Sequence, residues 1–410
     1  MKSWQTITVM CAAHVFSMAG FATFPALLPT LVPLWELSNT QAGWISGIFF
    51  GGYVAAVPIL VSLTDRVDSR RVYLAGLLIT TAGLSGFAFA TTGFWSAMIW
   101  QAVQGAGVGG TYMTGLRVMT DRLPDGAPSR AIAFYTGAFS VGTAISFVVS
   151  GEIANRLGWE FAFAFAALGP LAAASIALLL LSSRRPDYET HPDTHLLDFR
   201  PVLRNRQAMA FTLGYTGHSW ELFALRSWIV AFLVFAGASE TSAGLLSATV
   251  IAGAANLFAV PASIIGNEFA ERYGRRRTIL VVMVLAVFSA LATGLSPSIS
   301  LTAAVVVFFV YNGFVMGDSA SLTAGAAAAA APGYRGATLA VHSILGFSGG
   351  LLGPLMVGLA LDLAGGQQSS LAWFAAFAVM GFGSTAGAVA LWRLGDTSSA
   401  IYRAQTDRSN

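Results

Sequence analysis

Long runs of apolar residues alternate with short polar stretches along this chain. Twelve runs stand out, and they cover approximately residues 5–31, 39–63, 71–92, 95–119, 130–153, 159–182, 207–236, 241–266, 277–295, 299–324, 335–363 and 370–393. A helix of about 20 apolar residues crosses the roughly 30 Å hydrocarbon core of a bilayer. The pattern therefore predicts an all-α integral membrane protein with twelve transmembrane helices.

The composition supports lipid as the solvent. Hydrophobic residues make up 55% of the 410 residues and charged residues 10%, whereas a soluble domain has about 25% charged residues. Such a chain has too few polar groups to cover its surface in water, so we expect a multi-pass protein of the inner or plasma membrane. The single cysteine, Cys11, excludes an internal disulfide and any zinc or iron–sulfur site built on several cysteines.

The basic residues predict the orientation, because cytoplasmic loops of membrane proteins carry an excess of lysine and arginine. With a cytoplasmic N-terminus, the even-numbered connections, their helix edges and both termini hold Lys2 and nearly all the arginines. Arg156 falls outside, and Arg226 lies within a span. We therefore expect both termini in the cytoplasm. The basic clusters are short and close to the spans, so no nucleic-acid partner is expected.

A polar break at residues 182–207 separates six predicted spans from six. We expect an N-terminal six-helix bundle (1–183), a cytoplasmic linker (184–206), a C-terminal six-helix bundle (207–396) and a cytoplasmic tail (397–410). The halves also echo each other: "DRVDSRR" (65–71) follows the second span, and "ERYGRRR" (271–277) follows the second span of the other half. Repeated half-proteins are typical of transporters built from related bundles.

These loops resemble the motif Gly-x-x-x-Asp-Arg-x-Gly-Arg-Arg of the major facilitator superfamily, and the resemblance extends over essentially the whole chain. The C-terminal copy matches the motif at Glu271, Arg272, Gly274, Arg275 and Arg276. The N-terminal copy keeps Asp65, Arg66, Arg70 and Arg71, with Val61 at the first glycine. The fourth-helix motif Arg-x-x-Gln-Gly-x-Gly is present as "QAVQGAG", with Gln101 in place of arginine, and the fifth-helix Gly-Pro antiporter motif is not evident. The resemblance implies a secondary transporter.

The acids and arginines of the two loops have a physical role apart from the family name. An acid at a helix end and arginines across the loop can hold one state of a rocking transporter through charge-assisted hydrogen bonds. We expect Asp65 and Glu271 to form such latches. The alternative is that these arginines only set the topology and meet lipid phosphates.

The stretch "GHSWELFALRSW" (217–228) places His218, Glu221 and Arg226 within an apolar span. Ionisable groups inside a membrane usually face a pathway or pair with one another. By resemblance, spans one, four, seven and ten line the central cavity, so Glu221 would face that cavity. His218 and Glu221 can share a helix face. Arg226 lies about 140° round the helix from Glu221 and about 7.5 Å further along, so we expect it to meet a substrate or another helix.

Other polar residues lie within the inner spans. Gln104 in the fourth span is a candidate for packing or for binding, and Tyr311 and Asn312 in the tenth are candidates for the cavity wall. Asp318 would act as a gate residue or as the partner of a loop arginine, and His14 would be a packed histidine. The glycine run "GAGVGG" (105–110) matches a dinucleotide fingerprint, but inside a span it predicts close helix packing.

The function expected is transport of a small solute by a monomer in the lipid bilayer. A guanidinium in the membrane interior favours an organic anion or zwitterion as substrate, and Glu221 favours proton-coupled symport, with no cofactor beyond the proton. The alternative is a proton-antiport efflux pump for drugs or metabolites, or a transport-inactive sensor or assembly protein. No catalytic constellation or metal-ligand cluster is evident in the sequence, so an enzyme is not expected.

Overall fold

The computed structural model describes residues 3–64, 66–123, 129–184, 199–238 and 245–395, which form helices and no strand. Ten helices of this described part are long and apolar enough to cross a membrane. They are α3 (Asn39–Leu63), α4 (Ser69–Ala90), α7 (Ser129–Leu157), α8 (Trp159–Leu180), α10 (Arg206–Ala236), α11 (Leu245–Tyr273), α12 (Arg275–Leu295), α13 (Leu301–Gly317) taken together with α14 (Ser319–Ala328), α15 (Arg335–Leu363) and α16 (Ser370–Leu394). The all-helical membrane fold class is confirmed. The count of twelve spans in two six-helix bundles stays a prediction.

Three predicted spans are not single helices. The first consists of α1 (Ser3–Ser17) and α2 (Thr23–Leu34), the fourth of α5 (Phe94–Gly109) and α6 (Tyr112–Thr120), and the tenth of α13 and α14. Glycines stand in or beside each break, and glycine has low helix propensity. The first break also precedes Pro25, whose nitrogen cannot donate a helical hydrogen bond. A hydropathy pattern does not register such breaks, because each is only one to five residues long within an otherwise apolar run.

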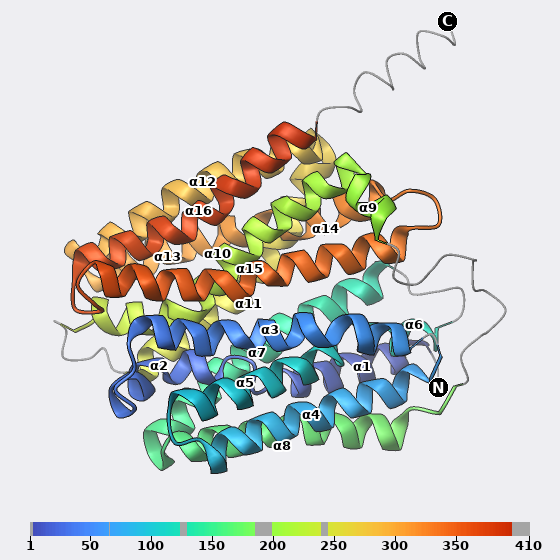
Figure 1. Cartoon of the computed structure of the whole chain (residues 1–410), viewed down its shortest axis with the longest axis horizontal. Coiled ribbons are helices and arrows are strands. Elements are labelled where there is room, and N and C mark those ends of the chain that lie inside the picture. Colours follow the sequence, from blue (N-terminus) through green and yellow to red (C-terminus); the bar gives the residue numbers. More distant parts are fainter. Residues whose placement is uncertain (1–2, 65, 124–128, 185–198, 239–244, 396–410) are drawn as a thin grey trace, which may run out of the picture.

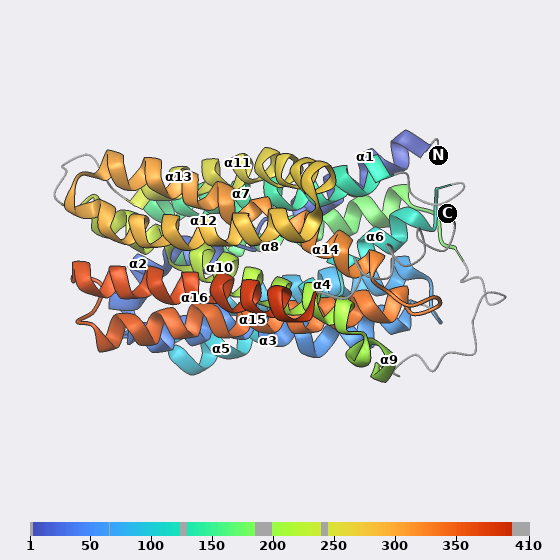
Figure 2. The same ribbon diagram turned by 90° about the horizontal axis from the view of Figure 1, so that it is seen from above.

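The helices gather in two groups that follow the chain order. Figure 1 shows α1–α8 on one side and α10–α16 on the other, and we call these the N-terminal and C-terminal halves. The short helix α9 (Arg200–Arg204) precedes α10. Across the boundary α3 packs along α15, α7 packs along α11, and α2 packs against α10. Figure 2 shows the same helices from above, with α6 and α9 at the same end. We call this the arginine-rich end, and there α4, α10, α12 and α15 begin.

The closest approaches between the halves lie toward the opposite end. A Cβ added at Gly43 of α3 would lie 2.5 Å from the carbonyl oxygen of Pro354 in α15, and one added at Gly253 of α11 would lie 3.1 Å from the carbonyl oxygen of Ala144 in α7. Glycine is therefore needed where these backbones meet, as is common between membrane helices. The glycine run in α5 also packs closely, since a Cβ at Gly105 would overlap the backbone of Phe49. Close packing by this run is confirmed.

The bundle exposes apolar side chains on its outside and buries α10 in its middle. Large apolar residues such as Ile59, Phe89, Leu179 and Phe288 are two-thirds or more exposed, as expected of surfaces that contact lipid chains. In α10, 83% of the most apolar stretch is buried, against 33–50% in the other nine candidate spans. Side chains in the middle of α10 therefore face other helices from every direction.

Candidate functional site

The site is built on α10, which is one uninterrupted helix. Asn205 caps it by accepting a hydrogen bond from the amide of Ala208 at 3.1 Å, and the helix continues to Ala236. His218, Glu221 and Arg226 are all buried, with exposed fractions of 1%, 1% and 7%. Because the helix is unbroken, Glu221 and Arg226 point in different directions and meet different partners.

The Glu221 carboxyl lies between three helices. The Tyr311 hydroxyl of α13 donates to Oε1 at 2.8 Å, and the Ser384 hydroxyl of α16 donates to Oε2. All three side chains are buried. Both carboxyl oxygens therefore have a neutral hydroxyl as partner, and no described lysine or arginine forms an ion pair with them. Tyr311 thus lies beside a candidate coupling residue, although the sequence suggested only a place on the cavity wall.

His218 pairs with Asp318 rather than with Glu221. Its Nδ1 lies 2.7 Å from the Asp318 Oδ1, and both side chains are almost fully buried. Asp318 stands at the junction of α13 and α14, so the break in the tenth span places its carboxyl against α10. The described side chain closest to this carboxyl is therefore the histidine and not a loop arginine.

Equivalent aromatic stacks flank the site in the two halves. In the N-terminal half, His14 of the first helix stacks on Tyr135 of α7, with ring centroids 4.2 Å apart and planes at 12°. In the C-terminal half, Tyr215 of α10 stacks on His342 of α15 at 4.2 Å and 18°. The tyrosine and the histidine exchange places between the halves. This packing matches the reading of His14 as a packed histidine.

Arg226 lies at the boundary between the halves and lines a pocket. Its guanidinium carbon is 5.6 Å from the ring centroid of Phe139 in α7 and 5.9 Å from that of Phe223 in α10. The empty space between the atoms of this pocket is about 380 Å³, a figure that includes open solvent, and only about 20 Å³ of it is accessible to the centre of a water molecule in this state. Its walls come from α2 and the residues before it, from α3, α5 and α7 of the N-terminal half, and from α10. Within the described chain, Arg226 forms no ion pair and its Nε has no hydrogen-bond acceptor.

Three further polar side chains line this pocket: Ser46 of α3, Gln101 of α5 and Ser227 of α10. The Ser46 hydroxyl is buried and has no hydrogen-bond partner among the described residues. Gln101 takes the place of the arginine in the fourth-helix motif, so the pocket keeps a polar group there without a second positive charge. The sequence identified Gln101 only as the residue in place of the motif arginine and gave no sign of Ser46, because serine is common in membrane helices.

Two predicted site residues lie in interhelical hydrogen bonds. Gln104 Nε2 donates to the carbonyl oxygen of Gly20 at 2.8 Å, inside the break between α1 and α2. Asn312 Nδ2 donates to the carbonyl oxygen of Ala255 in α11 at 2.8 Å. Both amides therefore hold helices together in this state. Their role in binding a substrate stays a prediction.

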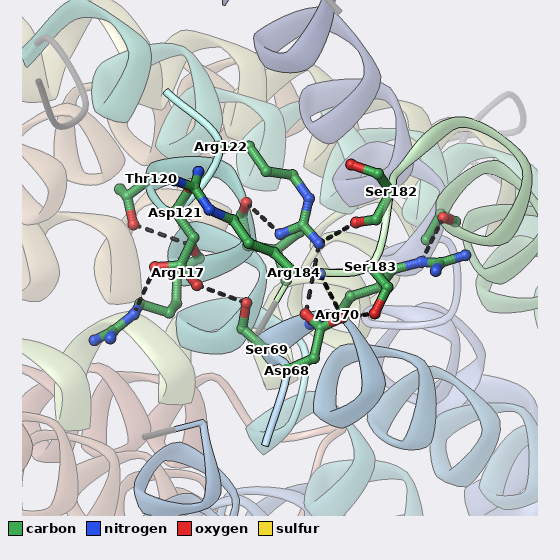
Figure 3. A network of polar contacts seen from close by, with 12 residues as sticks. Asp68, Ser69, Arg70, Arg117, Thr120, Asp121, Arg122, Ser182, Ser183 and Arg184 are labelled. Carbon is green, nitrogen blue, oxygen red and sulfur yellow. Dashed lines mark hydrogen bonds and ion pairs between the residues drawn. The ribbon is translucent and has the colours of Figure 1, made fainter. Parts of the chain in front are cut away.

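A polar network joins helix ends at the arginine-rich end of the N-terminal half (Figure 3), and its centre is Asp68. The Asp68 carboxylate accepts hydrogen bonds from the amides of Arg70 and Arg184, both at 3.0 Å, and from the Ser183 hydroxyl at 2.8 Å. Arg122 lies 3.5 Å away. Burial would raise the pKa of Asp68, but these hydrogen bonds and the Arg122 charge outweigh it and lower that pKa below its usual 3.8. Asp65, the acid that the motif selects, lies outside the described residues.

The trailing arginines of the two loops bind the ends of neighbouring helices. Arg70 donates to the carbonyl oxygens of Ala177 and Leu178, at 3.1 and 2.7 Å, at the end of α8. Arg276 donates to the carbonyl oxygen of Trp392 at 2.7 Å, near the end of α16. A cation at a helix C-terminus is favourable, because the last carbonyl groups lack partners and the helix dipole is negative there.

The remaining motif residues have weaker or more exposed surroundings. Arg71 is exposed, Glu271 accepts a hydrogen bond from Asn267 at 3.1 Å, and Arg272 lies 5.4 Å from the ring of Tyr273. The other motif positions are Arg66, which is exposed, Gly274 with φ +95°, and Arg275, which is partly buried. None of the contacts given above for these motif loops joins the two halves: those of Asp68 and Arg70 lie on the N-terminal side, and those of Glu271 and Arg276 lie within the C-terminal half. A latch between the halves at this end stays a prediction.

A contact between the halves that sequence reasoning missed lies at the opposite end. Asp362, near the end of α15, accepts hydrogen bonds from the amide and side chain of Asn39 at 3.0 and 2.8 Å. It also accepts from the amide and hydroxyl of Thr40 at 2.8 and 2.6 Å. These residues form the first turn of α3, whose positive dipole end favours a carboxylate. The only signal of this contact in the sequence is the capping box of Ser38 and Gln41. It marks the start of a helix but does not identify Asp362 as the partner of that helix end.

Comparison with known proteins finds transporters. A family model of the Major Facilitator Superfamily matches residues 9–354. Protein spinster homolog 1 of Homo sapiens is 21% identical over 243 residues, which are 57% of this chain and 46% of that protein. An uncharacterized MFS-type transporter, YcaD of Escherichia fergusonii, is 25% identical over 290 residues, 67% of this chain and 71% of that one. The match thus spans less than half of the human relative.

Solved structures share the fold. A bacterial homologue of the human lysosomal transporter Spinster, in an inward-facing and unoccupied conformation, superimposes with a TM-score of 0.74 at 15% identity and covers 96% of this chain and 95% of its own. The nucleoside transporter NupG superimposes with a TM-score of 0.77 at 13% identity and covers 97% and 100%. At these identities the likeness establishes the fold and leaves the substrate open.

Proposed function

The chain belongs to the major facilitator superfamily of membrane transporters, and we propose that it moves a small organic anion or zwitterion by alternating access and proton symport. The observation that carries the proposal is Arg226, a buried guanidinium that lines a pocket between the halves and has no acidic partner in the described chain. A cation inside a membrane protein is costly unless an anion meets it. A carboxylate, sulfonate or similar group of the solute would supply that anion.

The position of the pocket fits a site that changes access. Its walls come from both halves, so a relative rotation of the halves would open it first to one side of the membrane and then to the other. In the described state the halves approach most closely toward the end opposite the arginine-rich end. Substrate held at Arg226 would lie where the two halves separate.

Glu221 is the proposed coupling residue. Its carboxyl lies about one and a half turns from Arg226 on the same helix, and its partners are two hydroxyls that hydrogen-bond to either protonation state. Protonation would remove a charge from the interior of the bundle, where charges are expensive. His218, which contacts Asp318, lies about one turn nearer the arginine-rich end of the same helix.

The test combines a thermal-shift screen of the purified protein with transport in proteoliposomes. We expect anionic metabolites to raise the unfolding midpoint, and Arg226→Ala to weaken their binding by about tenfold to a hundredfold, the usual loss of hydrogen bonds to a charged group. Arg226→Lys should recover only part, because a lysine does not provide the two-point geometry of a guanidinium. Arg156→Ala, which removes an exposed arginine from the opposite end, is the matched control and should bind as the parent does.

The same vesicles test the coupling. Glu221→Gln should abolish accumulation driven by a pH gradient while leaving counterflow exchange, and Glu268→Gln, which changes an exposed acid of α11, should retain both. Accumulation that persists in Glu221→Gln would remove Glu221 as the coupling site. If the ligands found are lipophilic cations whose binding survives Arg226→Ala, the organic-anion proposal fails and the efflux alternative replaces it.

A further inference from the structure

We propose that the Arg226 pocket selects an amphipathic monoanion, with one anionic group on an aromatic or apolar body, over a zwitterion or a neutral solute. The inference deepens the proposed function and depends on it, since it concerns the same pocket. It separates two substrate classes, anion and zwitterion, that the residues of α10 alone leave open.

The charges around the pocket carry the first step. Arg226 is the only ionisable residue among the described residues that line it, and none of them is acidic. The nearest acid along α10 is Glu221, whose two oxygens already accept hydrogen bonds from Tyr311 and Ser384. The ammonium group of a zwitterion would lose its water in this pocket and find no carboxylate, and an unpaired buried charge is strongly unfavourable. A single anionic group would instead find the Arg226 guanidinium as a partner of opposite charge.

The walls carry the second step. Six of the twelve residues that line the pocket are phenylalanine, so most of a bound molecule would contact aromatic carbon. The guanidinium also makes cation–π contacts with Phe223, which lines the pocket, and with Phe139, and such contacts do not neutralise its charge. Several of these rings already pack on one another, and an aromatic or branched apolar body would add further apolar contact with them, whereas a small hydrophilic anion would not.

The unpaired polar groups carry the third step. The Ser46 hydroxyl and the Arg226 Nε are buried without hydrogen-bond partners in the described part of the chain, and Gln101 lines the same pocket. Buried polar atoms normally have partners, so a ligand with an acceptor group would satisfy them. A carboxylate beside Arg226 can accept hydrogen bonds from the guanidinium and from a second donor at the same time. The hydrogen bonds that a neutral amide or alcohol accepts are weaker.

The experiment uses three probes of matched shape: 3-phenylpropionate, L-phenylalanine and 3-phenylpropanamide. Binding to the purified full-length protein is followed by the shift of its unfolding midpoint and by titration calorimetry. We expect 3-phenylpropionate to bind about tenfold or more tightly than the other two, the usual value of a charge-assisted contact against an unpaired buried group. Propionate, which has the same charge and no ring, should bind more weakly than 3-phenylpropionate.

The dependence on Arg226 completes the test. Arg226→Ala should abolish the preference for 3-phenylpropionate over 3-phenylpropanamide. If the alanine variant does not fold, Arg226→Lys takes its place, because lysine keeps the positive charge. Equal or tighter binding of phenylalanine, or Arg226-dependent binding of small hydrophilic anions such as succinate alone, would overturn the inference and leave the proposed function standing. If no anion of any kind binds in an Arg226-dependent manner, the proposed function fails as well.

Discussion

Individual charged side chains inside this bundle fall into two kinds. Glu221 and Asp318 each have a described partner, a pair of hydroxyls for the first and a histidine for the second. Arg226 has only aromatic faces. The Glu221 carboxyl has a hydrogen-bond donor at each oxygen within the protein, whereas a buried guanidinium without an acidic partner in the described chain favours an anion from outside. This difference is why we propose Arg226 for the substrate site and Glu221 for the coupling site.

Asp68 gives a prediction at the residue scale. Asp68→Asn replaces one of the two carboxylate oxygens that accept three hydrogen bonds by an NH2 group and removes the charge that faces Arg122, and should lower the stability of the protein by roughly 1–3 kcal/mol at neutral pH. The pKa of Asp68 is lowered from 3.8. Its contribution is therefore present above that pH and is lost as the pH falls through the lower pKa of the folded state. Unfolding midpoints of parent and variant between pH 3 and pH 7 measure this.

The comparison needs a control for the loss of one acid. Glu152→Gln breaks the exposed ion pair with Arg156, and such pairs contribute about 0–1 kcal/mol, so its midpoint should stay near that of the parent. The difference between parent and Asp68→Asn should shrink below pH 3.8. A difference that is already absent at pH 7 would show that the network does not stabilise the protein.

The sequence located the charged residues of the site but not their partners. Polar residues in an apolar run are visible at once, so His218, Glu221 and Arg226 could be found from the pattern alone. The contacts of Glu221 come from residues 90 and 163 positions away, and those of Asp362 from more than 320 positions away. Such pairings depend on how helices pack, which a single sequence does not encode in any local pattern.

At the scale of the elements, hydropathy predicted the positions of the long apolar helices but not the breaks within them. Eight of the nine uninterrupted helices agree with the predicted ranges to within about four residues, because each is bounded by polar residues, whereas α11 ends at Tyr273, seven residues beyond its predicted range. The breaks near Gly20, Gly110 and Asp318 interrupt apolar runs, and two of them lie beside site residues. The break at Asp318 places a carboxyl against His218, and the first break offers the Gly20 carbonyl to Gln104.

The contact between α3 and α15 gives a prediction at this scale. A Cβ at Gly47 would overlap the carbonyl oxygen of Leu351, and backbone atoms have little room to give way. Gly47→Ala should therefore destabilise the protein by about 1–3 kcal/mol, as overpacking generally does. The loss of stability is measured as a lower unfolding midpoint. Gly137→Ala in α7 meets nothing within 4 Å and should be neutral or slightly stabilising, because alanine favours helix more than glycine. Equal midpoints for the two variants would contradict the close approach.

For the molecule as a whole, the two halves meet at one end through Asp362. The carboxylate of α15 in one half accepts four hydrogen bonds from Asn39 and Thr40, which begin α3 in the other half. These contacts have to break when the halves separate at that end, so their strength enters the balance between the two states of an alternating-access cycle. Gln367 adds a hydrogen bond to Asn39 at 2.6 Å and fixes the side chain that faces Asp362.

Asp362→Asn should shift the balance toward states in which this end is open. The amide keeps the size of the carboxyl group but removes the charge that the α3 N-terminus favours, and charge-assisted hydrogen bonds contribute roughly 1.5–3 kcal/mol, which corresponds to a population change of about tenfold or more. Spin labels at Leu34 and Leu371, two exposed residues of opposite halves near this end, report the change as a longer distance when Cys11 is replaced by serine. Glu160→Gln, an exposed acid in the first turn of α8, is the control and should leave the distance distribution unchanged. If Asp362→Asn keeps the distance distribution of the parent, both in the absence and in the presence of an anion that binds at Arg226, then Asp362 caps α3 but does not govern how the halves move.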